Sequence, residues 1–363
     1  MLVYKIVRCC YFDCVKSNLT GIRGIAALWV WSLHYNEYFT GLLPITSKLD
    51  FITQRGKYGV DLFFCLSGFI LGHVYYENLS QHPSRGNINQ FFYKRMARLY
   101  PVYVSTLLVA TLFYLLAILF EHEFDHESAS NLSIKSFFQN LLGVQAWFGT
   151  PSLNGPSWSV SAEFGAYLFF PIIVVFIGKI KKRKLATGFL VVSIAIYELS
   201  LHQQLLINHQ MVQVLCEFTM GLCCYLQFRS LDYSLIVCRI LRFTLLILLF
   251  SLLYFVKSDI ILSSVLPLLL MGLITLNFPH NIEGKGLSRS IPITLGIWSY
   301  SLYMTHRLLQ NVMSGLSLPV YDTLLAIRIL QSFLLVCVPI FVAHFVTKHL
   351  ENPARRYVLN KWK

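Results

Sequence analysis

The sequence predicts an all-α protein, a polytopic bundle of about ten transmembrane helices with both termini on the cytoplasmic side. Three observations lead to this prediction: an apolar composition, a recurrence of apolar runs about 20 residues long, and an uneven distribution of basic residues between the runs. The chain of 363 residues is 56% hydrophobic and only 13% charged, with a mean hydropathy of +0.59. Soluble domains carry about 25% charged residues, so this composition indicates a membrane protein.

The apolar runs have the length that a helix needs to cross the hydrocarbon core of a bilayer. They lie at 20–39, 58–77, 99–120, 158–178, 185–200, 210–227, 238–256, 259–277, 292–313 and 324–348. The fifth run and the pair 238–277 are the weakest, because the pair would need a very tight turn at 257–259. We expect the longest gap, 121–157, to be a loop.

These runs divide the chain into three parts. Residues 1–18 form a cytoplasmic N-terminal segment, residues 19–350 the membrane domain and residues 351–363 a basic cytoplasmic tail.

The basic residues indicate the orientation of the runs. The net charge is +13, and many Lys and Arg residues stand in alternate gaps, such as "KIKKRK" at 179–184. An intervening gap, "EHEFDHES" at 121–128, is acidic, whereas the gap at 40–57 departs from the pattern. A nucleic-acid-binding protein would instead gather its cations on one solvated surface. We therefore expect the lipid bilayer, and not a nucleic acid, as the partner; the pattern predicts no oligomeric state.

The cysteines give no reason to expect a metal. There are nine, none in a CxxC pair, and most stand inside apolar runs, as Cys65 and Cys223 do. Buried thiols of this kind behave as small hydrophobic side chains. We expect no metal ion.

Two ionisable residues in the first run share one helical face. Arg23 and His34 are eleven residues apart, which is three turns plus about 20°, or about 16 Å along the axis. A charge in mid-bilayer costs about 2.5–3.5 kcal/mol and is commonly functional. A snorkelling arginine and a hydrogen-bonded structural histidine would also explain the pair.

Three further runs place ionisable residues at a depth similar to that of His34. They are Asp61 in "YGVDLFFCLSGFILG", Glu163 in "GPSWSVSAEFGAYLFFP" and His306 in "LGIWSYSLYMTH". A carboxylate beside an imidazole fixes its tautomer, which suits a general base that takes a proton from an alcohol. Glu217 is another buried acid, which fits equally well a pairing partner for a neighbouring span and a functional residue. No GxSxG nucleophile elbow is present, so we expect direct attack by a hydroxyl.

The stretch "FFYKRMARLYP" at 91–101 precedes the third run. Arg95 and Arg98 are three residues apart and so lie on one helical face, with Lys94 beside them. The guanidinium fork suits phosphate, although ordinary positive-inside residues would give the same pattern.

Taken together and in order, these stretches resemble the acyltransferase-3 family of integral-membrane O-acyltransferases. "LTGIRGIAALWVWSLH" is similar to its R-x10-H signature, and the stretches around Asp61, Arg95, Glu163 and His306 and the terminal "ENP" to its later signatures. The resemblance implies a ten-helix core in a bacterial cytoplasmic (inner) membrane. It implies transfer of an acyl group, commonly acetyl, from cytoplasmic acyl-CoA to a hydroxyl of a cell-envelope carbohydrate, with no permanently bound cofactor.

The resemblance also implies roles for single residues. Arg23 and His34 match the family's essential pair, and Arg95 and Arg98 match the pair that meets the CoA phosphates. Thr20 is a departure, because the family commonly has Asp there, so an acidic partner for Arg23 is missing or comes from elsewhere. Positions of the other signatures are matched by two acids that we expect to assist catalysis and three residues that we expect to bind substrate: Asp61, Glu163, Trp158, Ser161 and His306.

Two other functions fit part of the pattern. A transporter or flippase would use buried carboxylates and histidines as a proton relay. A membrane acyltransferase of the group that pairs an embedded His with Asn or Asp could use His306, but this would leave Arg23 and His34 unexplained.

Overall fold

The computed structural model describes most of the chain, and all of its described regular structure is helical. The described residues are 2–119, 132–179, 209–228, 235–256 and 290–361, with isolated positions between 188 and 272. This confirms the all-α class.

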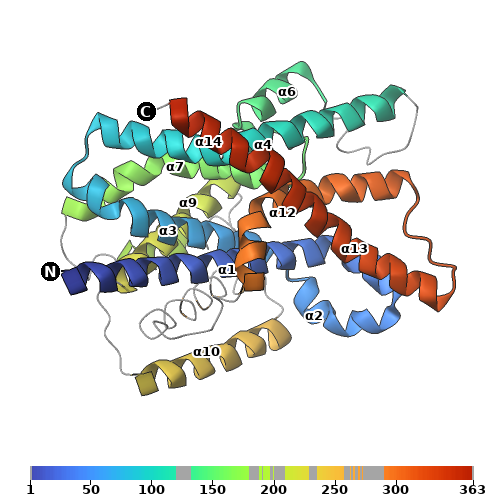
Figure 1. The fold of residues 1–363 in the computed structure, drawn as a ribbon, viewed down its shortest axis with the longest axis horizontal. Coiled ribbons are helices and arrows are strands. Elements are labelled where there is room, and N and C mark those ends of the chain that lie inside the picture. The colour runs from blue at the N-terminus through green and yellow to red at the C-terminus, as the bar shows by residue number, and fades with distance from the viewer. Residues whose placement is uncertain are drawn as a thin grey trace.

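Eight of the predicted runs coincide with long helices (Figure 1). In chain order these are α1 (Leu2–Leu42), α3 (Tyr58–Gln81), α4 (Arg85–Leu119), α7 (Ser157–Lys179), α9 (His209–Phe228), α10 (Leu235–Phe255), α12 (Ser290–Gly315) and α13 (Leu325–Val346). The run expected at 185–200 is described in part, and its described residues 188–189, 191–196 and 199 are helical, whereas the run expected at 259–277 lies largely outside the described residues. So do the turn at 257–259, the acidic gap at 121–128 and the basic gap at 179–184.

Shorter elements appear where the sequence predicted none. The expected loop 121–157 contains α6 (Ile134–Leu141), which begins where the Ser133 side chain accepts a hydrogen bond from the Ser136 N–H, and the 3₁₀-helix η2 (Gln145–Phe148). Helix α1 starts at Leu2, because its first 19 residues contain no glycine or proline to end it. Two further short elements, η1 (Pro44–Leu49) and α2 (Asp50–Thr53), follow α1.

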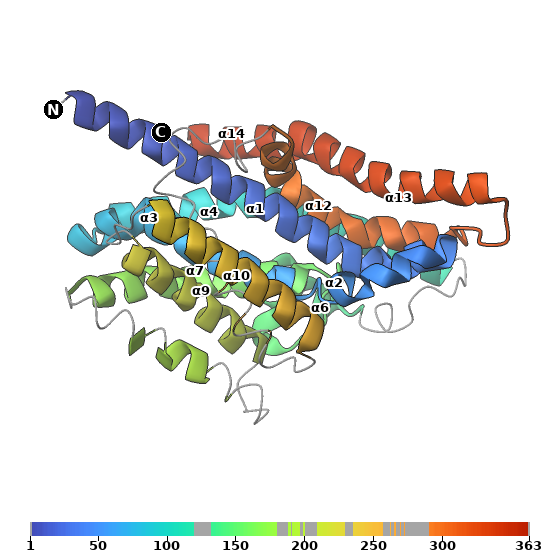
Figure 2. The same cartoon turned by 90° about the horizontal axis from the view of Figure 1, so that it is seen from below.

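The C-terminal residues continue beyond α13 without a break. A π-helix, η3 (Thr347–Glu351), leads into α14 (Asn352–Lys361), which packs against α4. The predicted tail is thus a helical part of the molecule. The start of α1 and helix α14 lie towards the same end of the bundle (Figure 2).

Four helical segments in the described part of the chain are long and apolar enough to cross a membrane. They are Pro44–Gln81, Arg85–Leu119, Ser157–Gly178 and Leu325–Lys361; Phe243–Phe255 is apolar but shorter. These segments agree with a membrane protein, whereas the count of ten spans and the side of the termini stay predictions.

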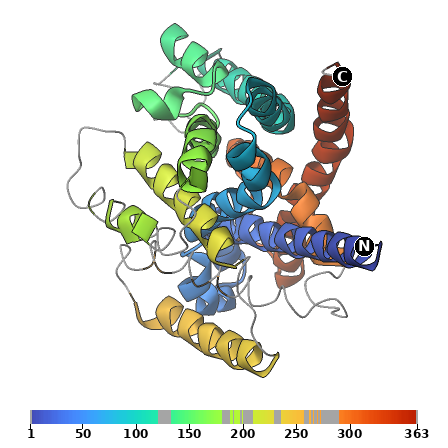
Figure 3. The same ribbon diagram turned by 90° about the vertical axis from the view of Figure 1, so that its left-hand side faces the viewer.

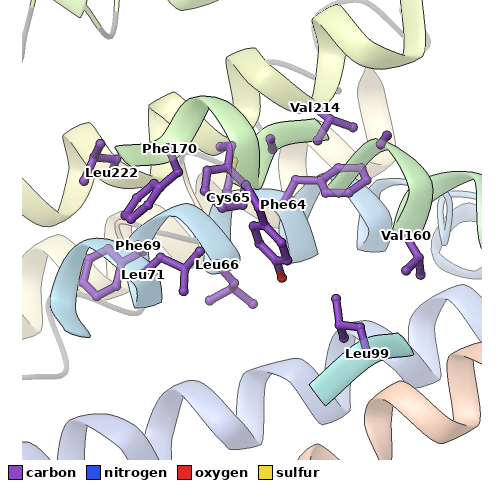
Figure 4. Packing of buried hydrophobic residues seen from close by; sticks show 14 of the residues in the cluster. Phe64, Cys65, Leu66, Phe69, Leu71, Leu99, Val160, Phe170, Val214 and Leu222 are labelled. Carbon is purple, nitrogen blue, oxygen red and sulfur yellow. The ribbon is translucent and has the colours of Figure 1, made fainter. Parts of the chain in front are cut away.

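Helix α3 forms the centre of the bundle, packed against α9, α7, α1 and α4 (Figure 3). More than half of its 24 residues are buried. Its apolar side chains, among them Phe64, Leu66 and Phe69, meet Phe170 of α7 and Leu222 of α9 (Figure 4). Gly68 permits this contact, because a Cβ there would lie 1.9 Å from the Phe218 carbonyl oxygen.

Helices α1 and α12 make the most extensive contact in the molecule. At Gly296 the two backbones touch, since a Cβ at this position would lie 1.8 Å from the Thr20 carbonyl oxygen. This close crossing sets the register between the two helices that carry His34 and His306.

Candidate active site

A narrow cavity of about 60 Å³ lies between α1, α3, α4, α7 and α12. Along α3 it extends from Val60 to Leu71, which is about 16 Å of helix. Apolar side chains form much of its wall, and Phe64, Leu71, Leu99 and Val160 are visible in Figure 4. The polar residues that line it are Arg23, Ser67, Arg95, Arg98, Ser159, Glu163, Tyr167, Ser299, Tyr300 and Tyr303.

One end of the cavity is cationic. Arg23, Arg95 and Arg98 all line it, and the described part of the chain provides no carboxylate in ion-pair contact with any of them. The Arg95 guanidinium lies over the Tyr75 ring, 5.3 Å from its centroid, and its Nη2 donates to the Tyr75 hydroxyl at 3.1 Å. Its Nε is buried and makes no hydrogen bond in the structure. An uncompensated group of guanidiniums is suited to a polyanion.

Glu163 lines the middle of the cavity. Its Oε1 accepts hydrogen bonds from Ser67 Oγ at 2.9 Å and from the Tyr167 hydroxyl at 2.6 Å. Tyr167 is within electrostatic range of Arg95 and Arg98 as well as of Glu163. The Glu163 carboxylate therefore lies next to the cationic end of the cavity.

Asp61 lies elsewhere, between α3 and α9. Gln213 Nε2 donates to Asp61 Oδ1 at 2.9 Å and also to Glu217 Oε1 at 3.3 Å, and both acids are buried. Asp61 is therefore turned away from the cavity, and the structure does not bring it to His34. This arrangement makes Glu217 a partner for the neighbouring helix α3, one of the two readings that the sequence left open.

Tyr303 and Ser159 form the other end of the cavity. The Tyr303 hydroxyl and Ser159 Oγ lie 2.8 Å apart, and both residues line the cavity. His306, which is 1% exposed, lies behind Tyr303 and its Nδ1 is 2.7 Å from the Tyr303 carbonyl oxygen. A carbonyl only accepts, so Nδ1 carries the proton and Nε2 is an acceptor when the ring is neutral. This Nε2 is buried without a hydrogen-bond partner in the structure.

His34 stacks on His306. The two ring centroids are 5.1 Å apart and the rings are tilted by 33°. Gln310 Nε2 donates to the His34 carbonyl oxygen at 3.0 Å, which ties α12 to α1 at this point. His34 and His306 thus lie at a similar depth, as predicted, and are in contact, but Tyr303 separates the pair from the cavity. Within the described residues, the side chain that contacts the His34 ring is the imidazole of His306. No described carboxylate takes this place.

Trp158 and Ser161 support the site from behind. The Trp158 ring packs edge-on against Phe64, at 6.2 Å between centroids, and Phe64 lines the cavity. Ser161 Oγ accepts from the Ala146 N–H at 3.1 Å and so anchors η2 to α7. Neither is among the described residues that line the cavity, so their expected contact with substrate is not seen.

Sequence reasoning missed several polar residues of the cavity, such as Ser67, Tyr167 and Tyr303. Two of them carry a local signal. Tyr167 stands one helical turn after Glu163, and Tyr303 stands three residues before His306, so each shares a face with a predicted residue.

A model of the acyltransferase domain family matches residues 16–347. The chain belongs to the acyltransferase-3 family.

Curated relatives agree with this membership. The chain is 32% identical over 173 residues to acyltransferase MdmB of Streptomyces mycarofaciens, covering 46% of this chain and 41% of the relative. It is 44% identical over 99 residues to protein 2 in the picA locus of Rhizobium radiobacter, covering 27% and 44%. It is 28% identical over 185 residues to the peptidoglycan O-acetyltransferase OatA of Listeria monocytogenes, covering 46% and 26%.

The matched part of the chain spans less than half the length of each of these relatives. No solved structure matches the chain.

Proposed function

We propose that the protein is a membrane O-acyltransferase that moves an acyl group, an acetyl group in the first instance, from acyl-CoA to a hydroxyl of a cell-envelope glycan. Membership of the acyltransferase-3 family supports acyl transfer. The observation that carries the proposal is the cavity, which leads from three arginines, none of them in ion-pair contact with a described carboxylate, towards a pair of imidazoles.

The cationic end suits the donor. Arg95 and Arg98 hold the phosphates of acyl-CoA, with Arg23 beside them, because forked guanidiniums bind phosphate oxygens in pairs. The buried, unsatisfied Nε of Arg95 gains a partner when a phosphate arrives. The pantetheine arm then lies along the apolar wall and carries the thioester towards Ser159 and Tyr303. In this arrangement both termini and the arginine end face the cytoplasm of a bacterial inner membrane.

The imidazole pair suits the acceptor. His34 is only half-buried, whereas His306 is fully buried, so His34 is the base that a hydroxyl reaches and His306 is its positioning residue. His34 takes the hydroxyl proton as the oxygen forms a bond to the thioester carbonyl carbon. The carbon–sulfur bond breaks, and the proton passes to the thiolate, which leaves as CoA thiol. Tyr303 must turn aside for the thioester to reach this pair.

Glu163 assists through its charge. It is within electrostatic range of Tyr303, which touches His306. Glu163 thus acts on the imidazole pair from the far side of Tyr303, as a negative charge that favours the imidazolium formed during the step.

The test is acyl transfer by the purified protein. Acetyl-CoA and an envelope-glycan extract are supplied, and base-labile acetyl esters are detected by mass spectrometry together with released CoA thiol. We expect His34→Ala to lower the rate by about 10² or more. His349→Ala is the matched control, because this exposed imidazole contacts only Phe345 among its described ring neighbours.

Full transfer by His34→Ala would remove the proposed base. Ester formation that continues when acyl-CoA is left out would remove the proposed donor.

A further inference from the structure

We propose that Arg355, on α14, is a third phosphate-binding residue of the donor site and binds the 3′-phosphate of CoA. This inference rests on the proposed function. Arg355 and its neighbour Glu351 lie beyond residues 16–347, which the family model matches.

The position of Arg355 follows from how the chain ends its helical path. Helix α14 packs on α4, where the Tyr93 hydroxyl donates to the Val358 carbonyl oxygen at 2.5 Å. This contact places Arg355 within electrostatic range of Arg95, Arg98 and Tyr75. The hydroxyl of Tyr75 already accepts from Arg95, so guanidiniums of two different helices gather beside the part of the cavity that Arg95 and Arg98 line.

The repulsion between these arginines is only partly offset by acids of the described residues. Like charges repel, and the described residues place no carboxylate in ion-pair contact with Arg95, Arg98 or Arg355. Arg95 in addition leaves its buried Nε without a hydrogen-bond partner. A ligand with several negatively charged oxygens satisfies both conditions.

Glu351 offsets part of the repulsion between these arginines. It is 7% exposed, and its Oε2 accepts from Ser301 Oγ at 2.8 Å. It is also within electrostatic range of both Arg98 and Arg355. The π-helix Thr347–Glu351 buries Thr347 and Glu351 together, and such turns are frequent at functional sites. Glu351 is thus a positioning residue.

The burial of the three arginines indicates which phosphate of CoA each of them binds. Arg95 and Arg98 are half-buried and line the cavity, whereas Arg355 is exposed and does not. The thioester must enter deepest, so the opposite end of CoA, which carries the 3′-phosphate, remains at the mouth. Arg95 and Arg98 then meet the pyrophosphate and Arg355 the 3′-phosphate.

The experiment measures equilibrium binding of three probes to the full chain in neutral-lipid nanodiscs: CoA, dephospho-CoA, which lacks the 3′-phosphate, and pantetheine. The variants are Arg355→Ala, Arg355→Lys and the adjacent, also exposed control Arg356→Ala. We expect the wild type to prefer CoA over dephospho-CoA by about tenfold, the effect of one charge-assisted contact.

Arg355→Ala is expected to bring this ratio close to one and Arg356→Ala to leave it unchanged. For Arg355→Lys we expect a ratio between those of the wild type and Arg355→Ala, because an ammonium group keeps the charge but lacks the forked geometry of a guanidinium. Pantetheine binding should be the same in all variants.

Three results would overturn the inference. If Arg355→Ala keeps the wild-type ratio, Arg355 serves another ligand, such as an anionic lipid headgroup, and the proposed function still stands. If the variant weakens CoA and dephospho-CoA equally, the assignment to the 3′-phosphate is wrong. If the wild type binds neither CoA nor dephospho-CoA, the proposed donor is wrong and the inference falls with it.

Discussion

Two carboxylate sites in this protein contain similar side chains and differ in what surrounds them. Glu163 is half-buried and faces the cavity, where two hydroxyl groups donate to one of its oxygens. Asp61 and Glu217 are buried and share one amide group of Gln213 in a contact between α3 and α9. The comparison teaches that burial of an acid does not by itself make it a candidate for catalysis, because a candidate must also face the cavity.

The largest effect is expected where the Asp61 site depends on close helix contact. In Gly68→Ala the new Cβ meets the Phe218 carbonyl oxygen at 1.9 Å, so α3 and α9 must separate. We expect a loss of about 3 kcal/mol in the free energy of unfolding, measured by unfolding in mild detergent. Gly188→Ala is the control, because a Cβ there meets nothing within 4 Å. A stable Gly68→Ala would mean that the two helices do not touch in this way.

The second-largest effect is expected on kcat, which should distinguish the Glu163 site from the Asp61 site. Glu163→Gln keeps an oxygen for Ser67 and Tyr167 but removes the charge, and we expect kcat to fall about a hundredfold, or about 2.7 kcal/mol in the barrier. Asp61→Asn is the matched variant at the Asp61 site and should stay within about threefold of the wild type. The reverse order of effects would show that the acid between α3 and α9 is the catalytic one.

Loss of the shared amide should affect stability and spare activity. Gln213→Leu leaves Asp61 and Glu217 buried without the donor that joins them. We expect this to cost about 2 kcal/mol of unfolding free energy. Thr219→Val, on the same helix, removes only a bond to the helix's own Leu215 carbonyl and is expected to cost less. Equal costs for the two variants would contradict a special role for the amide.

The smallest effect is expected at the end of the cavity near the imidazoles. Tyr303→Phe removes the hydroxyl that lies 2.8 Å from Ser159 Oγ but keeps the ring beside His306. We expect kcat to change by about fivefold and the KM for acyl-CoA to stay constant, since the arginine end is untouched. A large rise in KM would instead place Tyr303 at the donor phosphates.

Much of the fold was predictable from the sequence because lipid imposes a simple rule. A backbone in hydrocarbon must satisfy its own hydrogen bonds, so long apolar runs predict helices, and eight of them coincide with described helices. Residues 1–18 were predicted only as a cytoplasmic N-terminal segment, and from Leu2 onward they form the first turns of α1. Residues Glu351 to Lys361 are likewise helical where a basic tail was expected.

For the site, the sequence alone predicted candidate residues and their approximate depth, because depth follows from the rise of 1.5 Å per residue. The contact between His34 and His306 agrees with the similar depth predicted for these two residues. Only the tertiary structure decided which way each side chain faces across the bundle, since that depends on how neighbouring helices are rotated. The rotation of the helices in the bundle places Asp61 beside Gln213 and Glu163 in the cavity. The packing of α14 on α4 places Arg355 near the arginines of α4.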